Sequence, residues 1–307
     1  MCDIRDASPL ATDPWSDWLL RRRHGGDPDY ERIILQRVER IRDRVLDGAR
    51  LTSGMTVLDV GTGDGVIAFG ALERLQNRAS LIVTDISQPL LKHVEAIASA
   101  RGVLDRCTFL CGSAENLAGV GDASIDAATA RAVLAYVEDK AAALRELFRV
   151  LKPGGRVSIA EPIFRDAALH LSAFTRHLET LPLGPETVPL RLAQRWQASQ
   201  LPSTEEDASR NSMTDFSERD LVVFCRAAGF VQVHLELHID VRRVAPLRWD
   251  TFLDTALHPR APTPREILAA AFNDTECRQF EASTRPAVEA GQVVERDMIA
   301  YLVAVKD

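Results

Sequence analysis

The sequence predicts an α/β fold in which a mostly parallel β-sheet carries a helical cap. Between residues 57 and 160, short apolar runs alternate with segments of helical periodicity, as a parallel sheet with helices on both faces requires. The first apolar run ends in alternating glycines and the second ends in a carboxylate. Two further alternating runs near the C-terminus complete seven candidate strands. These patterns favour one enlarged ligand-binding domain.

Composition limits the class of protein. With 307 residues, of which 46% are hydrophobic and 26% charged, the chain can bury one large core and lacks the low hydrophobicity of disordered proteins. Its net charge is −7, and its one basic block is Arg21–Arg23. A nucleic-acid partner is therefore disfavoured.

The chain also lacks signals for membranes, secretion and metal. No segment approaches the roughly twenty uninterrupted apolar residues that span a bilayer, and residues 1–6 are too polar to open a signal peptide. We therefore expect a cytoplasmic protein. Five cysteines form no Cys-x-x-Cys pair, which predicts reduced thiols and no metal site. Cys107 and Cys111, four positions apart in a strand, would lie about 13 Å from each other.

The N-terminal segment, residues 13–50, predicts helices that cover a ligand cleft. Trp15 and Trp18 either dock this segment on the core or stack on a substrate. Arg21–Arg23 reads as a solvated face, although one of these arginines or Tyr30 could reach an anionic group at the cleft mouth.

The segment Val57–Ala68 predicts a ligand-binding turn. Gly61, Gly63 and Gly65 remove side chains where a buried strand gives way to a helix N-terminus, so backbone amides can approach a ligand. Asp85 ends the next apolar run about twenty residues later, where a carboxylate can accept hydrogen bonds from ribose hydroxyls. The pair predicts an adenosine compound, the alternative being a tight turn followed by a solvated aspartate.

Details of the turn identify the resemblance. A dinucleotide site requires a third small residue where this chain has Val66. Asp59 and the spacing Gly61-x-Gly63-x-Gly65 instead resemble the first motif of class I S-adenosyl-L-methionine (SAM)-dependent methyltransferases. The resemblance implies a Rossmann-like sheet of seven strands with the last one antiparallel. It also implies cofactor contacts at Asp59, Gly61, Thr62, Gly63, Gly65, Asp85 and Ile86.

The resemblance continues along the chain. Phe109–Leu117 is similar to the third strand and adenine-contacting loop of that family, with Ser113, Ala114 and Glu115 near the base. Arg131 and Ala132, after the fourth strand, are placed where cofactor and substrate meet; a salt bridge at the sheet edge is the alternative for Arg131. In Lys152–Gly155, Pro153 blocks helix continuation, and Gly154 and Gly155 permit a left-handed turn.

The chain divides into six predicted segments. They are an N-terminal helical cap (1–50), a SAM-binding core (51–161), a helical lid (162–213), a core continuation (214–241), a second cap insertion (242–293) and a closing strand (294–307). Within the continuation, Ser217 predicts a helix N-cap and Gly229 a helix stop. Val231–Ile239 and Met298–Val305 alternate as the last two strands. Insertions of this length indicate a lid that carries specificity.

Within the family, the chain resembles the small-molecule branch typified by ubiquinone and menaquinone biosynthesis. This resemblance implies methyl transfer to an O, N or C atom of a small, partly apolar metabolite. Positioning in a dry cleft can supply much of the acceleration. Glu161 and His170 are the candidate bases, with a hydrogen-bonding or surface role as the alternative. His234 and His238 share a strand face and read as packed or solvent-facing. The candidate substrate contacts are aromatic: Trp15, Trp18, Tyr30, Tyr136, Phe164 and Trp196.

Two other functions stay open: a different reaction on SAM, and a non-catalytic partner subunit of the same fold. The acceptor, the attacked atom and the oligomeric state, a homodimer included, also stay open.

Overall fold

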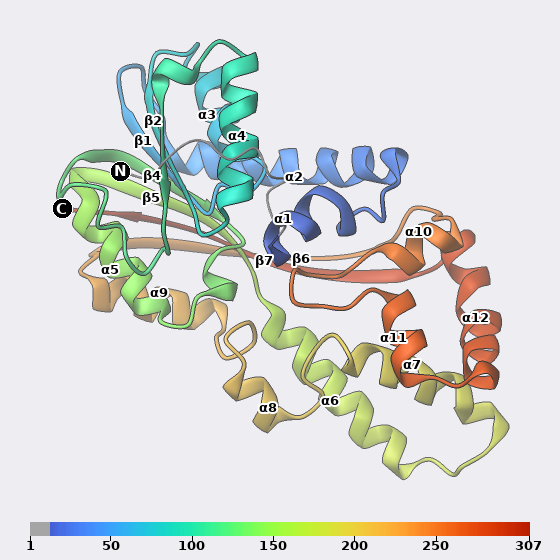
Figure 1. Ribbon diagram of the computed structural model, residues 1–307. Coiled ribbons are helices and arrows are strands. Elements are labelled where there is room, and N and C mark those ends of the chain that lie inside the picture. Colours follow the sequence, from blue (N-terminus) through green and yellow to red (C-terminus); the bar gives the residue numbers. More distant parts are fainter. Residues whose placement is uncertain (1–12) are drawn as a thin grey trace.

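A seven-stranded sheet organises the computed structural model, which describes residues 13–307 (Figure 1). The strand order is β3-β2-β1-β4-β5-β7-β6. Only β7 runs antiparallel to its neighbours, β5 and β6, so the predicted mostly parallel sheet is confirmed. The strands are β1 (Thr56–Val60), β2 (Ser80–Asp85), β3 (Cys107–Cys111), β4 (Ile125–Arg131), β5 (Leu151–Pro162), β6 (Gln232–Arg243) and β7 (Val294–Val305).

Helices cover both faces of the sheet and enclose two apolar cores. On one face lie α2 (Pro28–Ala49), α3 (Val66–Arg74) and α4 (Gln88–Ala100), whose buried residues include Leu46, Ile67 and Val94. On the other face lie α5 (Lys140–Val150) and α9 (Glu218–Ala228), which bury Leu144 and Leu221. A sheet buried on both faces explains why its central strands read as apolar runs.

The position of α2 corrects one expectation. This helix packs on β4, β5, β7 and α3, and a Cβ on Gly48 would collide with Ser158 and Val303. It is a core helix, so the prediction that the helices of residues 13–50 cover the cleft is wrong for α2. The shorter α1 (Pro14–Asp17) and the π-helical turn Trp18–Arg22 that follows it do reach the cleft.

Local signals in the sequence account for several helix ends and turns. Ser217 caps α9 through a hydrogen bond from the Asp220 amide, and Gly229 ends that helix with φ of 112°, as predicted. Gly154 is left-handed, with φ of 78°, whereas Gly155 is not. Position 155 has no room for a side chain, because a Cβ there would lie 2.8 Å from the Lys152 carbonyl oxygen. The prediction of a left-handed Gly155 is therefore wrong.

The last two strands extend beyond the sheet and support a group of helices (Figure 1). β7 begins at Val294, earlier than the predicted Met298, and pairs with β6 as far as Arg243. Helices α7, α10, α11 and α12 gather near the far end of this hairpin, around buried Leu192, Trp249 and Phe280. The insertion helices are α6 (Phe164–Thr180), α7 (Val188–Ala198), α8 (Glu205–Arg210), α10 (Trp249–Asp254), α11 (Pro264–Ala271) and α12 (Asp274–Glu289).

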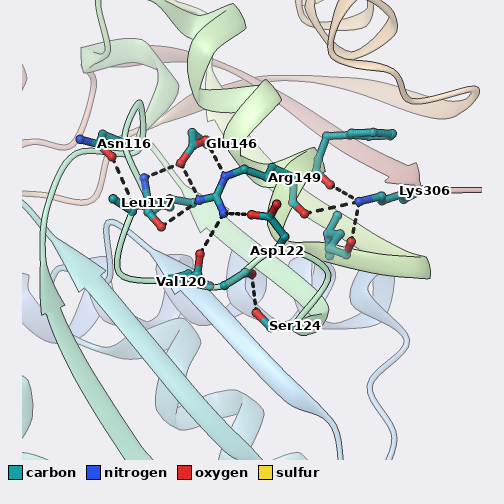
Figure 2. A network of polar contacts seen from close by, with 12 residues as sticks. Asn116, Leu117, Val120, Asp122, Ser124, Glu146, Arg149 and Lys306 are labelled. Atoms are coloured by element: carbon teal, nitrogen blue, oxygen red, sulfur yellow. Dashed lines mark hydrogen bonds and ion pairs between the residues drawn. The ribbon is translucent and has the colours of Figure 1, made fainter.

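A polar network fixes the loop between β3 and β4 (Figure 2). The Arg149 guanidinium of α5 donates to the carbonyl oxygens of Leu117 and Val120 and pairs with Asp122 and Glu146. Glu146 in turn accepts a hydrogen bond from the Leu117 amide at 2.7 Å. Because this loop begins at Gly112, the network helps to position the residues after β3 that face the cleft.

Within residues 13–307, no helix is both long and apolar enough to cross a membrane. The cysteines at 107, 111, 225 and 277 are free thiols, and Cys2 lies outside the described residues. In the same part of the chain, no three His, Cys, Asp or Glu side chains are grouped so as to hold a metal ion.

Candidate functional site

A cavity of about 270 Å³ opens at the carboxyl ends of β1, β2 and β4. Ligands of open α/β sheets bind at such an edge, because the loops that leave neighbouring strands converge there. Nine of the predicted cofactor residues line this one cavity: Gly61, Gly63, Asp85, Ile86, Ser113, Ala114, Glu115, Arg131 and Ala132. The sequence motifs, far apart in the chain, therefore meet in space.

The glycine turn forms one wall of the cavity. Gly61 and Gly63 adopt φ of 62° and 57°, in the left-handed region that favours glycine. A Cβ on Gly61 would collide with the Val133 side chain, and one on Gly63 would lie 2.9 Å from Leu19 Cδ2. The turn is thus in close contact with the loop after β4 and with the N-terminal segment, and any side chain here would disturb both.

Asp85 joins the second strand to this turn. Its Oδ2 accepts a hydrogen bond from the Gly63 amide at 2.9 Å, and its Oδ1 accepts one from the Ser87 amide at 2.8 Å. Burial raises the pKa of this carboxyl group, while the two amides oppose the shift. Each carboxylate oxygen retains a lone pair, so the group can still accept hydrogen bonds from two ligand hydroxyls.

Three predicted cofactor residues lie behind the turn and do not line the cavity. Asp59 is buried and its Oδ1 accepts a hydrogen bond from the Thr129 hydroxyl at 2.8 Å, while burial raises its pKa to about 7. Gly65 caps α3 with φ of 80° and packs against Phe69. Thr62 is buried beside them. Their prediction as contacts is corrected: the side chains of Asp59 and Thr62 and the backbone of Gly65 shape the turn from the protein side.

The loop after β3 is held in place by its own side chains. The Ser113 hydroxyl donates to Glu115 Oε2 at 3.0 Å, and Glu115 Oε1 accepts from the Asp139 amide at 2.7 Å. Ser113, Ala114 and Glu115 line the cavity together with Ile86. A planar ligand group could pack against Ile86 and this loop.

Aromatic side chains from the N-terminal segment and from the loop after β4 form a further part of the cavity lining. The rings of Trp15 and Tyr136 meet edge to face, with centroids 5.0 Å apart. Trp18 also lines the cavity, and its indole N–H donates to the Ala256 carbonyl at 2.9 Å. The tryptophans therefore dock the N-terminal segment and also line the cavity, and stacking on a substrate stays a prediction.

Arg260 and Pro259, from the second insertion, also line this part of the cavity. No pattern in the sequence predicted either residue. The Arg260 guanidinium lies 5.9 Å from the Trp15 ring centroid and 5.7 Å from that of Tyr136. It also donates to the Ser212 hydroxyl at 3.1 Å and to the Tyr136 carbonyl at 3.0 Å. No local motif surrounds Arg260, so only the tertiary fold reveals its position.

His258 anchors Arg260 from behind. It is buried, and its Nε2 lies 2.9 Å from the Gln200 carbonyl oxygen, while its Nδ1 accepts a hydrogen bond from the Arg260 amide at 3.2 Å. Burial lowers the pKa of this imidazole, so it stays neutral and bridges the two insertions. The first insertion thus supports the site indirectly, and none of its described residues lines the cavity.

Three of the predicted substrate contacts lie elsewhere. Tyr30 is near Glu295 and Asp297, on a part of α2 that packs beside β7. Phe164 packs against His258, and Trp196 belongs to the aromatic cluster that includes Phe252 and Phe280. These three predictions are corrected, because the aromatic side chains are used to build the core and the cap.

Neither candidate base is available in the cavity. Glu161 is fully buried, and its carboxylate accepts hydrogen bonds from the amides of Val133 and Leu134 at 2.9 Å and of Ala135 at 3.2 Å. Burial raises its pKa to about 7. His170 is exposed on α6. Glu161 therefore shapes the loop that carries Val133, and the prediction of either residue as the base is wrong. The exposed pair His234 and His238 flanks Glu236 on β6.

The arrangement fits the adenosine part of SAM. The strand-end carboxylate of Asp85 faces the cavity beside the glycine turn, and the apolar side chain of Ile86 follows it.

Comparisons with known proteins agree with this geometry. Residues 51–205, half of the chain, match the family described as "Methyltransferase domain". The ubiquinone/menaquinone biosynthesis C-methyltransferase UbiE of Idiomarina loihiensis is 34% identical over 116 residues, which are 38% of this chain and less than half, 46%, of that enzyme. Nocamycin O-methyltransferase of Saccharothrix syringae is 28% identical over 66% of this chain and 68% of that enzyme.

Solved structures share the fold. The YcgJ protein of Bacillus subtilis superposes with a TM-score of 0.51 at 20% identity, covering 86% of this chain and 97% of that one. A protein of Bacillus halodurans C-125 gives a TM-score of 0.52 at 17% identity, covering 86% and 98% of the two chains.

Proposed function

We propose that this chain, which belongs to the methyltransferase domain family and uses SAM as its methyl donor, methylates a small and partly apolar acceptor held beneath Trp15 and Tyr136. The observation that carries the proposal is the continuity of the cavity. Asp85 and the glycine turn, Arg131 and Ala132, and the aromatic residues all line this one cavity. A donor at one end and an acceptor at the other would meet near Ala132.

The polar groups around Asp85 would bind the cofactor. The Asp85 carboxylate would accept hydrogen bonds from the ribose hydroxyls, and Gly61 and Gly63 would let the backbone approach the ligand. Ile86 and the loop Ser113–Glu115 would enclose the adenine. Bound SAM supplies an electrophilic methyl group on a sulfonium.

The acceptor end combines apolar surface with one cation. Trp15 and Tyr136 offer flat apolar faces, and the Arg260 guanidinium lies beside both. Such a pocket suits a molecule with a planar apolar part and an electronegative substituent. The segments 13–22, 162–213 and 242–293 would together form the cap, with the first insertion acting through Ser212 and Gln200.

Catalysis would depend on how the acceptor is positioned and not on a strong protein base. No histidine is among the described residues that line the cavity, and burial raises the pKa of the Tyr136 phenol, which stays protonated. A nucleophile that is acidic by itself, such as a phenol or an enol, would need no strong protein base. The named relatives methylate carbon and oxygen, and both atoms are nucleophilic in an enolate. Holding that nucleophile in line with the methyl group, away from water, would supply the acceleration.

We also propose that the enzyme acts in the cytoplasm and without a nucleic-acid partner. The net charge of −7 supports this proposal, because a phosphate backbone attracts basic proteins.

Incubation with SAM that carries a labelled methyl group, together with a panel of phenols and enols, tests the function. We expect S-adenosylhomocysteine and labelled product in equal amounts, and about tenfold less of both with the Asp85→Ala variant at SAM concentrations below the wild-type Kd. Consumption of SAM without methylated product would indicate a different reaction on SAM. Absence of S-adenosylhomocysteine with every acceptor, from a protein that binds SAM, would favour the non-catalytic alternative.

A further inference from the structure

Two arginines line the cavity, and neither has an acidic partner. Arg131 ends β4, and Arg260 comes from the second insertion. In the part of the chain that the structure describes, neither guanidinium forms an ion pair. The basic block of the N-terminal segment differs, because each of its arginines is paired: Arg21 with Asp17, Arg22 with Glu266 and Arg23 with Asp64. The lining therefore carries positive charge that no carboxylate of residues 13–307 matches.

Arg260 is held in place by neutral groups. Its Nη1 donates to the Ser212 hydroxyl at 3.1 Å, and its Nη2 donates to the Tyr136 carbonyl at 3.0 Å. A guanidinium has more N–H donors than these two bonds use. Its Cζ also lies 5.9 Å from the ring centroid of Trp15. The cation is thus fixed beside an aromatic surface and keeps free donors.

Arg131 adds a second positive charge near Tyr136. Burial raises the pKa of the Tyr136 phenol, and the charges of Arg131 and Arg260 both oppose that shift. Arg131 is also close enough to Asp59 and Glu161 to lower the pKa of each carboxyl group, but burial has the larger effect and raises both pKa values to about 7. These two carboxyl groups already accept hydrogen bonds from other residues. They therefore balance the charge of Arg131 only in part.

The carboxylates of the lining do not pair with these arginines either. Asp85 and Glu115 accept hydrogen bonds from backbone amides, and Glu115 also accepts one from a serine hydroxyl. Glu138 is exposed and, among the described residues, makes no ion pair. A cation beside an apolar, partly enclosed surface is costly unless a group of opposite charge pairs with it. The two unmatched guanidinium groups therefore favour a ligand with a negative charge.

We propose that the methyl acceptor is a planar carboxylic acid, whose carboxylate is bound by Arg260 with Arg131 as a second positive charge. Its apolar part would pack against Trp15 and Tyr136. The inference rests on the proposed function and names the chemical class of the acceptor. A guanidinium and a carboxylate have matching planar geometry, so two parallel hydrogen bonds can form. Such bonds are stronger in a partly enclosed cavity than in water.

A pair of probes, cinnamate and cinnamamide, tests the proposal, because the two share a planar apolar body and differ in charge. Each is titrated into the protein saturated with S-adenosylhomocysteine, and binding is followed in the NMR spectrum of the probe. For the wild-type protein we expect cinnamate to bind about tenfold or more tightly than cinnamamide. Arg260→Gln and Arg131→Gln should each weaken cinnamate several-fold and leave cinnamamide unchanged.

Two further variants serve as an opposite test and a control. Glu138→Gln removes a negative charge from the lining and should tighten cinnamate about twofold or more, with no effect on cinnamamide. Arg265→Gln alters a surface arginine that pairs with Asp254 and should change neither affinity. Melting temperatures show whether each variant is folded. If Arg260→Gln does not fold, Arg260→Lys keeps the charge, loses the planar fork and should still weaken cinnamate.

Equal wild-type affinities for the two probes, or binding of neither probe, would overturn the acidic acceptor and leave methyl transfer itself intact. Equal weakening of both probes by Arg260→Gln would show that Arg260 only supports the cavity wall. Loss of S-adenosylhomocysteine binding in Arg131→Gln, with cinnamate unaffected, would contradict the part given to Arg131. A wild-type protein that does not bind S-adenosylhomocysteine would instead overturn the proposed function.

Discussion

The carboxylate of Asp85 accepts a hydrogen bond from the backbone amide of Gly63 at 2.9 Å. This contact joins the end of β2 to the turn after β1, so the two features that predicted an adenosine ligand form one continuous surface. Neither residue is explained by packing alone, because both line the cavity.

Asp85→Ala should weaken SAM binding by about tenfold or more. The change would remove hydrogen bonds from ribose to a charged group, each contributing about 1.5–3 kcal/mol, and would also release the Gly63 amide. Calorimetry measures the loss. Asp105→Ala, at an exposed position before β3, is the matched control and should leave the affinity unchanged. An unaltered affinity for Asp85→Ala would reduce Asp85 to a structural residue.

Most cofactor residues could be predicted because each belongs to a short sequence motif. The residues that follow strands β1 to β4 are each marked by a short motif, and parallel strands bring their carboxyl ends to one edge. Asp85, Glu115 and Arg131 therefore meet as the sequence order implies. Asp59 and Gly65 belong to the same motif, but the Asp59 side chain is buried and Gly65 packs against Phe69. The motif alone does not separate these positions from the ones that line the cavity.

The acceptor end could not be predicted in the same way. Arg260 is brought to Tyr136 by a fold that spans 124 positions of sequence, and no periodicity marks it. Trp196 and Tyr30 were predicted as substrate contacts and carry aromatic rings, but an aromatic ring packs in a core as well as in a ligand pocket. Glu161 stands at a strand end like Asp85, yet three backbone amides occupy its oxygens.

Gly61→Ala should weaken SAM binding, and the backbone strain that it adds to the folded protein should not account for the whole loss of affinity. Alanine at a left-handed φ costs about 1–2 kcal/mol, and the added Cβ would collide with Val133. Gly102→Ala introduces the same backbone strain, at φ of 67°, with open space around the Cβ, and serves as the control. Adding Val133→Ala should restore part of the binding. If Gly61→Ala and Gly102→Ala changed SAM affinity equally, the close approach of Gly61 to its surroundings would not contribute to SAM binding.

Glu161→Gln should change how stability depends on pH. The folded protein holds the Glu161 proton up to about pH 7, whereas the usual pKa is 4.5. Between these values the folded state binds more protons than the unfolded state, so this carboxyl group makes the protein less stable as pH rises, and the effect levels off above pH 7.

Urea unfolding of wild type and Glu161→Gln from pH 4.5 to 8 isolates this contribution, since Asp59, with the same sign of shift, is common to both. The stability of wild type relative to the variant should fall by roughly 1–3 kcal/mol across that interval. A constant or rising difference would contradict the assignment of Glu161 as a buried, amide-bound carboxyl group.

Arg260→Ala should raise KM for the acceptor by roughly three- to thirtyfold, the range expected for a lost contact between a cation and an aromatic or polar group. SAM affinity should stay within about twofold, because Arg260 lies at the aromatic end of the cavity. Arg265→Ala, which removes a surface arginine paired with Asp254, is the control. A loss of SAM affinity equal to the loss of acceptor affinity would place Arg260 at the cofactor end instead.

The central claim is that the cavity between the glycine turn and Asp85 binds SAM rather than a dinucleotide. Calorimetric titration of the wild-type protein with SAM, S-adenosylhomocysteine and NAD tests it most directly. We expect micromolar binding of the first two, about −8 kcal/mol, with no heat from NAD. Tight binding of NAD, without binding of SAM or S-adenosylhomocysteine, would contradict it.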